Sequence, residues 1–212
     1  MLSIRRELLD AKLEKFQYLI TGNVLDIGGK KINKRGSFTP PENKNIFWTY
    51  LNLFSEENPD VVGNSNKLPF KNDIFDAVIM TEVLEYISRP EVAIKEIERV
   101  IKNEGHILLS VPFLNPFHGD YQSDLKRFTE SGLRDLISQT NLKIVTLDKM
   151  GHIGAVVFDI IRHNLTHSNR SFYQRIIFLI LRFLKPLFYL LDSLQNKNNF
   201  YITSGYFLVL KK

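Results

Sequence analysis

Apolar residues near the start of the chain recur at helical spacing and then give way to short apolar runs. Ile4, Leu8, Phe16 and Ile20 fall on one face of a helix, and Gly22 supplies a stop after it. The short runs that follow, several of them β-branched and aromatic, are typical of strands. We expect strands at residues 24–27, 46–51, 60–63, 75–80, 107–111, 142–147 and 200–210.

The run from Phe75 to Met80 shows almost no alternation between apolar and polar positions. A strand of this kind has both faces covered, as in a parallel sheet. Ser88 and Glu91 have the spacing of a capping box around Pro90, and Thr129 can cap the next helix. Alternating strands and helices predict an α/β fold with a doubly wound, Rossmann-like sheet. We expect seven strands, mostly parallel, with helices on both faces.

Residues 153–196 interrupt this alternation of strands and helices before the last strand. We therefore divide the chain into a main domain, residues 1–152 and 197–212, and an apolar helical insertion, residues 153–196. The part from residue 172 to 194 is apolar enough to raise the question of a membrane span. Its charged residues argue for an amphipathic helix pair or a kinked helix instead.

Charged residues of this segment fall on one side of a helix at about 100° per residue: Arg175, Arg182, Lys185 and Asp192. Pro186 is expected to kink the helix. Three interpretations stay open for the segment. It is a lid packed on the main domain, a homodimer surface, or an interfacial helix that makes peripheral contact with a membrane.

Composition excludes several kinds of site. The chain of 212 residues has no cysteine, so a disulfide framework, a thiolate zinc site and a cysteine nucleophile are excluded. His163 and His167 are four apart but have no accompanying acids in a metalloprotease pattern, so we predict no metal site. The charged start is unlike a signal peptide. We expect a soluble, cytoplasmic protein, with a peripheral position at the inner membrane face as the alternative.

The net charge of +5 fits anionic substrates or membrane surfaces, and it also fits an ordinary solvated lysine-rich surface. The basic residues are not interleaved with aromatic residues along one element. The chain also lacks an Asn/Asp-Pro-Pro-Tyr-type motif for a flipped base. We therefore expect no nucleic-acid partner.

The first strand carries the first candidate site, because ligands of open parallel sheets bind at the carboxyl ends of the strands. Asp26 lies at the end of this strand, and Gly28 and Gly29 follow it. Glycine lets the backbone approach a ligand closely. The G-x-G-x-x-G dinucleotide fingerprint and the P-loop are both absent, which disfavours a nicotinamide cofactor. A purely structural turn remains the alternative.

A series of segments carries a more specific signal: residues 24–29, 50–53, 59–64, 68–70, 75–87 and 105–112. In order and spacing, the series resembles the class I S-adenosylmethionine-dependent methyltransferases. It is most similar to the small methyltransferase-domain group associated with surface-polysaccharide biosynthesis. The resemblance covers roughly residues 22–148 and the closing strand, and it implies S-adenosyl-L-methionine as the cofactor.

The resemblance also implies individual roles. Asp26, Gly28 and Gly29 would face the methionine part of the cofactor, and Asn52 would meet the ribose hydroxyls. The family usually has an acid at the position of Asn52, because a carboxylate accepts from both hydroxyls. Asparagine offers one acceptor oxygen and a donor. We interpret Asn52 as variation within a working site, and a weakened or lost cofactor site is the alternative.

Further along the chain, Asn64 and Ser65 would lie by the adenine, and Thr81 and Glu82 would line the floor near the sulfonium. Asn64 replaces a usual acid, and Tyr86 stands where a histidine is frequent. The helix that usually follows the first strand is also hard to find in the sequence. These departures leave the alternative of a lost cofactor site open.

A second group of candidate residues follows the fifth strand: His118, Asp120, Asp124 and Arg127. It resembles the pattern of the polysaccharide-associated group, a histidine, then an acid, then Arg-Phe-Thr before a helix. Transfer to a hydroxyl usually needs a base, and the unperturbed pKa of His118 suits this role. Asp120 or Asp124 could orient His118 or bind substrate hydroxyls. Arg127 could clamp a carboxylate or phosphate.

The candidate catalytic residues are therefore His118, Asp120 and Arg127, and each has a plainer interpretation. Arg127 could pair with a local acid to fix the loop, and His118 could be polar surface. We further expect Asp76 to hold a turn at a strand start. We expect Glu85 to be a solvated or ion-paired helix acid.

We predict a methyltransferase that acts on a small or glycan-like acceptor, at an oxygen atom. One alternative is methylation of a lipid or quinone at a membrane surface, for which the apolar segment is the cue. The other alternative is a non-catalytic scaffold that keeps the fold without the cofactor, for which Asn52 and Asn64 are the cues. The acceptor assignment rests on the family resemblance alone.

Overall fold

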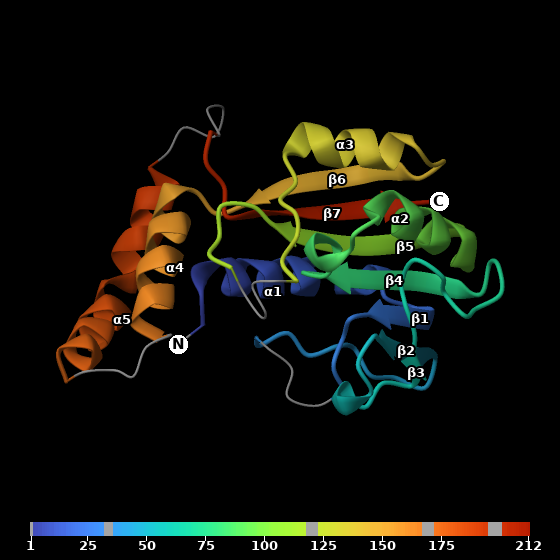
Figure 1. Cartoon of the computed structure of the whole chain (residues 1–212), viewed down its shortest axis with the longest axis horizontal. Coiled ribbons are helices and arrows are strands. Elements are labelled where there is room, and N and C mark those ends of the chain that lie inside the picture. Colours follow the sequence, from blue (N-terminus) through green and yellow to red (C-terminus); the bar gives the residue numbers. More distant parts are fainter. Residues whose placement is uncertain (1, 32–35, 118–122, 167–171, 195–200) are drawn as a thin grey trace.

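The computed structural model describes residues 2–31, 36–117, 123–166, 172–194 and 201–212 (Figure 1). Within these residues one sheet has seven strands: β1 (Gly22–Ile27), β2 (Ile46–Asn52), β3 (Val61–Val62), β4 (Phe75–Thr81), β5 (Ile101–Pro112), β6 (Lys143–Met150) and β7 (Gly205–Lys211). Their order is β3-β2-β1-β4-β5-β7-β6. β7 runs antiparallel to β5 and β6, and the other pairs are parallel. The predicted doubly wound α/β fold is confirmed.

Helices cover both faces of the sheet, which explains the unbroken apolar run in β4. On one face, Val78 and Met80 pack in a core with α2 (Pro90–Val100) and α3 (Glu130–Ser138). On the other face, Ala77 and Ile79 pack in a core with α1 (Ile4–Phe16). Successive residues of a strand point to opposite faces, so a strand between two helical layers needs apolar residues at every position.

Helix boundaries follow the predicted caps in part. Thr129 caps α3 as predicted, by accepting from the Gly132 N–H at 3.1 Å. Ser3, which was not predicted as a cap, caps α1 by accepting from the Arg6 N–H at 3.1 Å. The predicted capping box at Ser88 is wrong. Pro90 is the first residue of α2, so the cap position falls on Arg89, whose side chain makes no capping bond.

Two strand predictions also need correction. β5 begins at Ile101, ahead of the predicted start at residue 107, and its pairing with β4 is irregular between the pairs Phe75–Ile101 and Ala77–His106. β7 begins at Gly205, and the predicted start at Phe200 lies outside the described residues. Asp76 does hold the start of β4, because its carboxylate accepts from the Asn23 N–H at 2.8 Å.

Two further helices, α4 (Ile153–Thr166) and α5 (Phe172–Ser193), stand between β6 and β7 in the chain. They pack side by side at the end of the sheet to which the parallel strands point (Figure 1). Ala155 and Phe158 of α4 and Leu181 of α5 form a third core with Ile4. Pro186 lies inside α5, which continues past it. None of the described helices is both long and apolar enough to cross a membrane.

The sheet order reverses at β1, which has β2 on one side and β4 on the other. The crevice of a doubly wound sheet opens at this reversal, outside the carboxyl ends of the strands. Short 3-10 turns follow α1 and two of the strands: Gln17–Leu19, Ser55–Glu57 and Leu84–Tyr86. Among residues 28–31 and 36–45 there is no helix, so the usual helix after the first strand is missing from the described part of this connection.

Candidate active site

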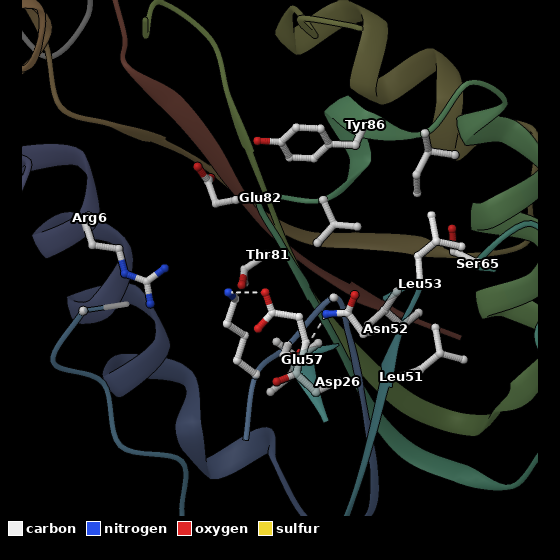
Figure 2. Close-up of a pocket in the computed structure, with 18 of the residues that line it drawn as sticks. Arg6, Asp26, Leu51, Asn52, Leu53, Glu57, Ser65, Thr81, Glu82 and Tyr86 are labelled. Carbon is white, nitrogen blue, oxygen red and sulfur yellow. Dashed lines mark hydrogen bonds and ion pairs between the residues drawn. The ribbon is translucent and has the colours of Figure 1, made fainter. Parts of the chain in front are cut away.

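A cavity of about 1130 Å³ opens at the carboxyl ends of β1, β2 and β4. Figure 2 shows Arg6 of α1 on one side of it and Asn52, Leu53 and Ser65 on the other. All of the predicted cofactor residues line this cavity: Asp26, Gly28, Gly29, Asn52, Asn64, Ser65, Thr81 and Glu82. The fold therefore gathers residues that lie up to 56 positions apart, from 26 to 82, around one space.

In the turn after β1, a Cβ atom at either glycine would clash with a neighbouring side chain. Gly28 has φ +78°, and a Cβ atom there would lie 2.4 Å from Cγ2 of Val83. A Cβ atom on Gly29 would lie 2.1 Å from Oδ2 of Asp26. The bare backbone of these residues borders the cavity, beside the half-buried Asp26 carboxylate. A close backbone approach next to a negative charge suits a ligand that carries an ammonium group.

Asn52 connects the ends of β1 and β2. Its Nδ2 donates to the Gly29 carbonyl oxygen at 3.4 Å, and its Oδ1 accepts from the Phe54 N–H at 3.2 Å. A carboxylate could not donate to the Gly29 carbonyl. The asparagine thus braces the glycine turn, which gives a physical reason for its presence where relatives usually have an acid.

The basic loop after the glycines is tied down at its start. The Lys30 ammonium lies 2.5 Å from the Glu57 carboxylate, and the Lys31 ammonium lies 2.5 Å from the Asp60 carboxylate. Lys30 and Glu57 both line the cavity. Because each lysine has an acidic partner, the described part of the loop is held at the rim of the cavity by ion pairs.

The far end of the cavity is a polar turn after β3. The Asn64 side-chain oxygen accepts from the Asn66 N–H at 2.9 Å, and Asn64 also forms an isolated bridge with Lys67. Ser65 is buried. Asn64 therefore shapes this turn through its own backbone neighbour, as asparagine commonly does.

The floor of the cavity is Thr81 and Glu82 at the end of β4. Glu82 has a left-handed backbone with φ +58°, an uncommon conformation for a residue with a side chain. Its N–H donates to the Ser110 carbonyl at 3.0 Å, and its Oε1 accepts from the Ser110 hydroxyl at 3.0 Å. The turn thus fixes the Glu82 carboxylate at the cavity wall.

A buried arginine, which sequence reasoning missed, meets that carboxylate. The Arg5 guanidinium forms an ion pair with Glu82. Burial lowers the pKa of Arg5 to about 10, although Asp159 and Glu85 oppose this shift. Arg5 is buried because the first turn of α1 lies at the carboxyl ends of the strands. No local pattern in the sequence predicts this position of α1.

Asp159 of α4 holds the start of α1 in this position. Its carboxylate accepts from the Ile4 N–H at 2.8 Å and from the Arg5 N–H at 3.0 Å. Burial raises the pKa of Asp159, while these two backbone bonds work against the rise. An acid at a helix N-terminus satisfies N–H groups that the helix leaves unpaired.

Of the two alternatives predicted for Glu85, the solvated acid is wrong, and interactions with two arginines fit the ion-paired acid. Its side chain is fully buried, and its charge acts on Arg5 and on Arg127. Its carbonyl oxygen accepts from the N–H groups of Leu125 and Lys126 at 3.0 and 3.1 Å. Glu85 therefore anchors the segment that follows β5.

Arg127 pairs with Asp124 through both arms of its guanidinium, with Nη2 to Oδ2 at 2.6 Å. This bond raises the pKa of Arg127. Arg127 does not line the cavity, although Asn115, Pro116 and Ser123 of the same segment do. His118 and Asp120 lie outside the described residues. The geometry of Arg127 matches the local ion pair, and the catalytic roles of the three residues stay predictions.

The wall opposite the sheet comes from α4. Arg162 and His163 line the cavity beside Asp159, and the Arg162 Nε lies 4.0 Å from Oδ1 of Asp159. Arg5 and Arg6 of α1 line the same side, and its three arginines all pair with carboxylates: Arg5 with Glu82, Arg6 with Asp10 and Arg162 with Asp159. The cavity therefore has two chemically different ends, a glycine turn with Asp26 and a wall of arginine–carboxylate pairs from α1 and α4.

Comparison with known proteins finds a family match over part of the chain. A model described as "Methyltransferase domain" matches residues 48–109. The demethylmenaquinone methyltransferase of Streptomyces griseus subsp. griseus is 36% identical over 72 residues, which are 32% of this chain and 31% of that protein. The chain thus matches about a third of the length of its curated relatives.

Solved structures share the fold over almost the whole chain. The [4+2]-cyclase SpnF has a TM-score of 0.59 at 16% identity, covering 96% of this chain and 79% of that one. A geranyl diphosphate methyltransferase in complex with S-adenosylmethionine has a TM-score of 0.57 at 11% identity, covering 95% and 84%. At these identities the likeness concerns the fold.

The fold is that of the class I S-adenosylmethionine-dependent methyltransferases, and the predicted resemblance is confirmed at this level. Within the chain, residues 48–109 match the methyltransferase domain family. That segment contains Asn52, Asn64, Ser65, Thr81 and Glu82 of the cavity. The association with surface-polysaccharide biosynthesis stays a prediction.

Proposed function

We propose that the chain is an enzyme that binds S-adenosyl-L-methionine in the cavity and transfers its methyl group to a small or glycan-like acceptor, at an oxygen atom. The turn Asp26–Gly29 carries this proposal. A Cβ atom at either glycine would clash with a neighbouring side chain, so only bare backbone borders the cavity there, and the Asp26 carboxylate borders the same cavity. These features fit the ammonium-bearing methionine part of the cofactor.

The remaining residues would hold the nucleoside. Asn52 would orient the ribose from the end of β2, and Asn64 and Ser65 would border the adenine. Thr81 and Glu82 would lie beneath the reacting centre, where their rigid turn excludes water from one side. When bound, the cofactor supplies an electrophilic methyl group. The protein's part is to orient the acceptor for in-line attack.

The acceptor would bind along the wall of the cavity formed by α1, α4 and the segment after β5. Hydroxyl and amide groups of Ser3, Ser88, Asn115 and Ser123 line this part and suit a hydroxyl-rich molecule. In transfer to a hydroxyl, the methyl–sulfur bond breaks, the methyl–oxygen bond forms, and the acceptor's proton passes to a base.

A lipid or quinone acceptor is the second candidate. The similarity to a demethylmenaquinone methyltransferase over 72 residues favours it, as does the exposed apolar surface of α5. A non-catalytic scaffold that keeps the fold without the cofactor is the third candidate, and its cues are Asn52 and Asn64, which stand where the family resemblance implies acids. The identity of the methyl acceptor distinguishes the glycan candidate from the lipid or quinone candidate. Binding of the cofactor distinguishes both of these enzymes from the scaffold.

Calorimetry with S-adenosylhomocysteine tests the cofactor assignment. We expect one-to-one binding with a dissociation constant on the order of 10 μM. Incubation with methyl-labelled S-adenosylmethionine and fractionated cell extract then identifies the acceptor. Label in a water-soluble glycan fraction supports the first candidate, and label in the lipid fraction supports the second. Absence of binding at millimolar ligand would leave the scaffold as the remaining interpretation.

Replacing Asn52 by Ala should weaken S-adenosylhomocysteine binding about tenfold, because one hydrogen bond to the ligand and the brace on the Gly29 carbonyl are lost together. Asn43→Ala is the matched control. Its side-chain oxygen makes a similar local bond, to the Asn45 N–H at 2.8 Å, away from the cavity. Equal affinities for both variants would exclude a role for Asn52 in the site.

Replacing His118 by Ala should leave the affinity for S-adenosylhomocysteine unchanged and slow methyl transfer about 100-fold, as loss of a general base does. The measurement is the initial rate of label incorporation into the accepting fraction. His152→Ala controls for removal of an imidazole elsewhere. Undiminished transfer by the His118 variant would remove its catalytic role and leave the cofactor site untouched.

A further inference from the structure

Helix α5 turns two of its charged residues, Lys185 and Asp192, toward the rest of the protein. Lys185 forms an ion pair with Glu7 of α1. Asp192 accepts from the N–H groups of His152, Gly154 and Ala155 at 2.9, 2.7 and 3.2 Å. The inward side of α5 thus contains the polar residues that an amphipathic helix would ordinarily direct to solvent.

The opposite side of α5 is apolar and exposed. Phe183 is 82% exposed and Leu194 is 73% exposed. More exposed aliphatic residues share this side: Ile176, Ile180, Leu187 and Leu190. We call these six residues the outer face of α5. Contiguous exposed surfaces of this kind mark sites of contact with proteins or membranes.

Arginines are the charged residues beside the outer face. Arg175 and Arg182 are exposed and lie two helical turns apart in one row. Arg182 is offset by about 100° from the buried Leu181, so the row lies at the boundary of the outer face. Long basic side chains at such a boundary can reach lipid headgroups while the apolar face lies deeper.

The acids of the two helices cannot neutralise these arginines. Within the described parts of α4 and α5 the acidic residues are Asp159 and Asp192. Both already accept backbone N–H groups inside the protein. A second copy docked through the same face would add two more arginines and no free carboxylate. Phosphates of an anionic bilayer supply the missing charge.

We propose that α5 lies in the plane of an anionic membrane surface, with its outer face in the boundary between headgroups and acyl chains and with Arg175 and Arg182 at the lipid phosphates. The neighbouring helix α4 lines the cavity through Arg162 and His163. Docking therefore holds the cavity next to the bilayer. The proposal concerns attachment and is independent of methyl transfer.

Flotation of the full chain with phosphatidylglycerol/phosphatidylcholine vesicles tests the apolar contact. The parent should float with the vesicles. In the double variant Phe183→Asp/Leu187→Asp the partition coefficient should fall roughly 100-fold, because two large side chains leave the acyl boundary. The control, Phe47→Asp/Val145→Asp, changes residues that are 62% and 57% exposed on the sheet edges and should bind like the parent.

The charge contact has its own pair of variants. Arg175→Gln/Arg182→Gln should reduce partitioning roughly 30-fold on anionic vesicles. The control, Lys95→Gln/Arg134→Gln, removes the same charge from exposed positions of α2 and α3 and should have no such effect. Loss of binding to the same extent in both variants would reduce the contact to unspecific charge attraction and overturn the proposal.

Two other outcomes would overturn the membrane proposal. One is a parent protein that does not bind the vesicles. The other is a stable dimer in light scattering that the double variant Phe183→Asp/Leu187→Asp dissociates, because a second copy would then cover the outer face. All variants should keep the affinity for S-adenosylhomocysteine. Loss of vesicle binding with retained cofactor binding therefore defeats only this proposal, and failure of cofactor binding in the parent defeats only the proposed function.

Discussion

Replacing Asp26 by Asn is expected to weaken binding of S-adenosylhomocysteine by about 100-fold, or about 3 kcal/mol. The substitution keeps the shape of the side chain and removes its charge, which would otherwise pair with the ligand's ammonium group. The crowding around Gly29 shows how closely this carboxylate borders the turn, since a Cβ atom there would lie 2.1 Å from it. Calorimetry gives the two dissociation constants directly.

A matched control separates the site from general effects of the charge. Asp148→Asn removes a half-buried carboxylate on β6 that pairs with Lys12, away from the cavity. It should bind S-adenosylhomocysteine like the parent. Parent-like affinity in the Asp26 variant would mean that the ammonium end of the ligand lies elsewhere, and the assignment of the glycine turn would fail with it.

Replacing Arg5 by Met is expected to lower the free energy of unfolding at pH 7 by about 3–5 kcal/mol. The arginine is buried between carboxylates, with Glu82 in a direct ion pair and with Asp159 and Glu85 close enough to affect its pKa. Its removal leaves buried negative charge without a counter-charge. Chemical denaturation measures the loss, and Lys15→Met on the exposed side of α1 is the control.

The loss should depend on pH in a defined direction. Burial raises the pKa of Asp159 in the folded protein above its unfolded value. The ionised group therefore costs stability above the folded-state pKa, and this cost disappears as the pH falls below the unfolded value. Without Arg5 the cost is larger, so the variant should recover part of its deficit on acidification. A deficit below 1 kcal/mol at every pH would contradict the buried-charge account.

The sheet and the end of the cavity at the glycine turn could be predicted because their signals are local. The unbroken apolar run of β4 indicated a strand covered on both faces, and two helical layers do cover it. The sequence Asp26–Gly29 ended the first strand where a doubly wound sheet binds ligands, and the cavity opens there. In both cases one short stretch of chain contained the physical cause.

The wall formed by α1 and α4 could not be predicted, because its contacts join residues that are far apart in the chain. Arg5 meets Glu82, and Asp159 meets the first turn of α1 across 155 positions. The burial of Glu85 was not predicted, because its neighbours in the sequence do not reveal that α1 and the segment after β5 pack against it. Burial of a charge depends on packing between elements, which hydrophobic periodicity does not encode.

Helix α5 illustrates the same limit in another form. Periodicity grouped Arg175, Arg182, Lys185 and Asp192 on one side of a helix, but only Lys185 and Asp192 contact the rest of the protein, while Arg175 and Arg182 are exposed. Periodicity also left open which side faces the protein. Partners at the start of α1 and of α4 decided this, because Glu7 and the N–H groups of α4 bind the two charges. The apolar side was thereby turned outward, against the usual expectation for a helix on a domain.

A crystal structure with S-adenosylhomocysteine tests the central claim most directly. The account predicts the ligand across the carboxyl ends of β1, β2 and β4, with its amino group at Asp26, its ribose at Asn52 and its adenine beside Ser65. A cavity that stays empty at saturating ligand, or one that the chain's own loop after Gly29 fills, would contradict it.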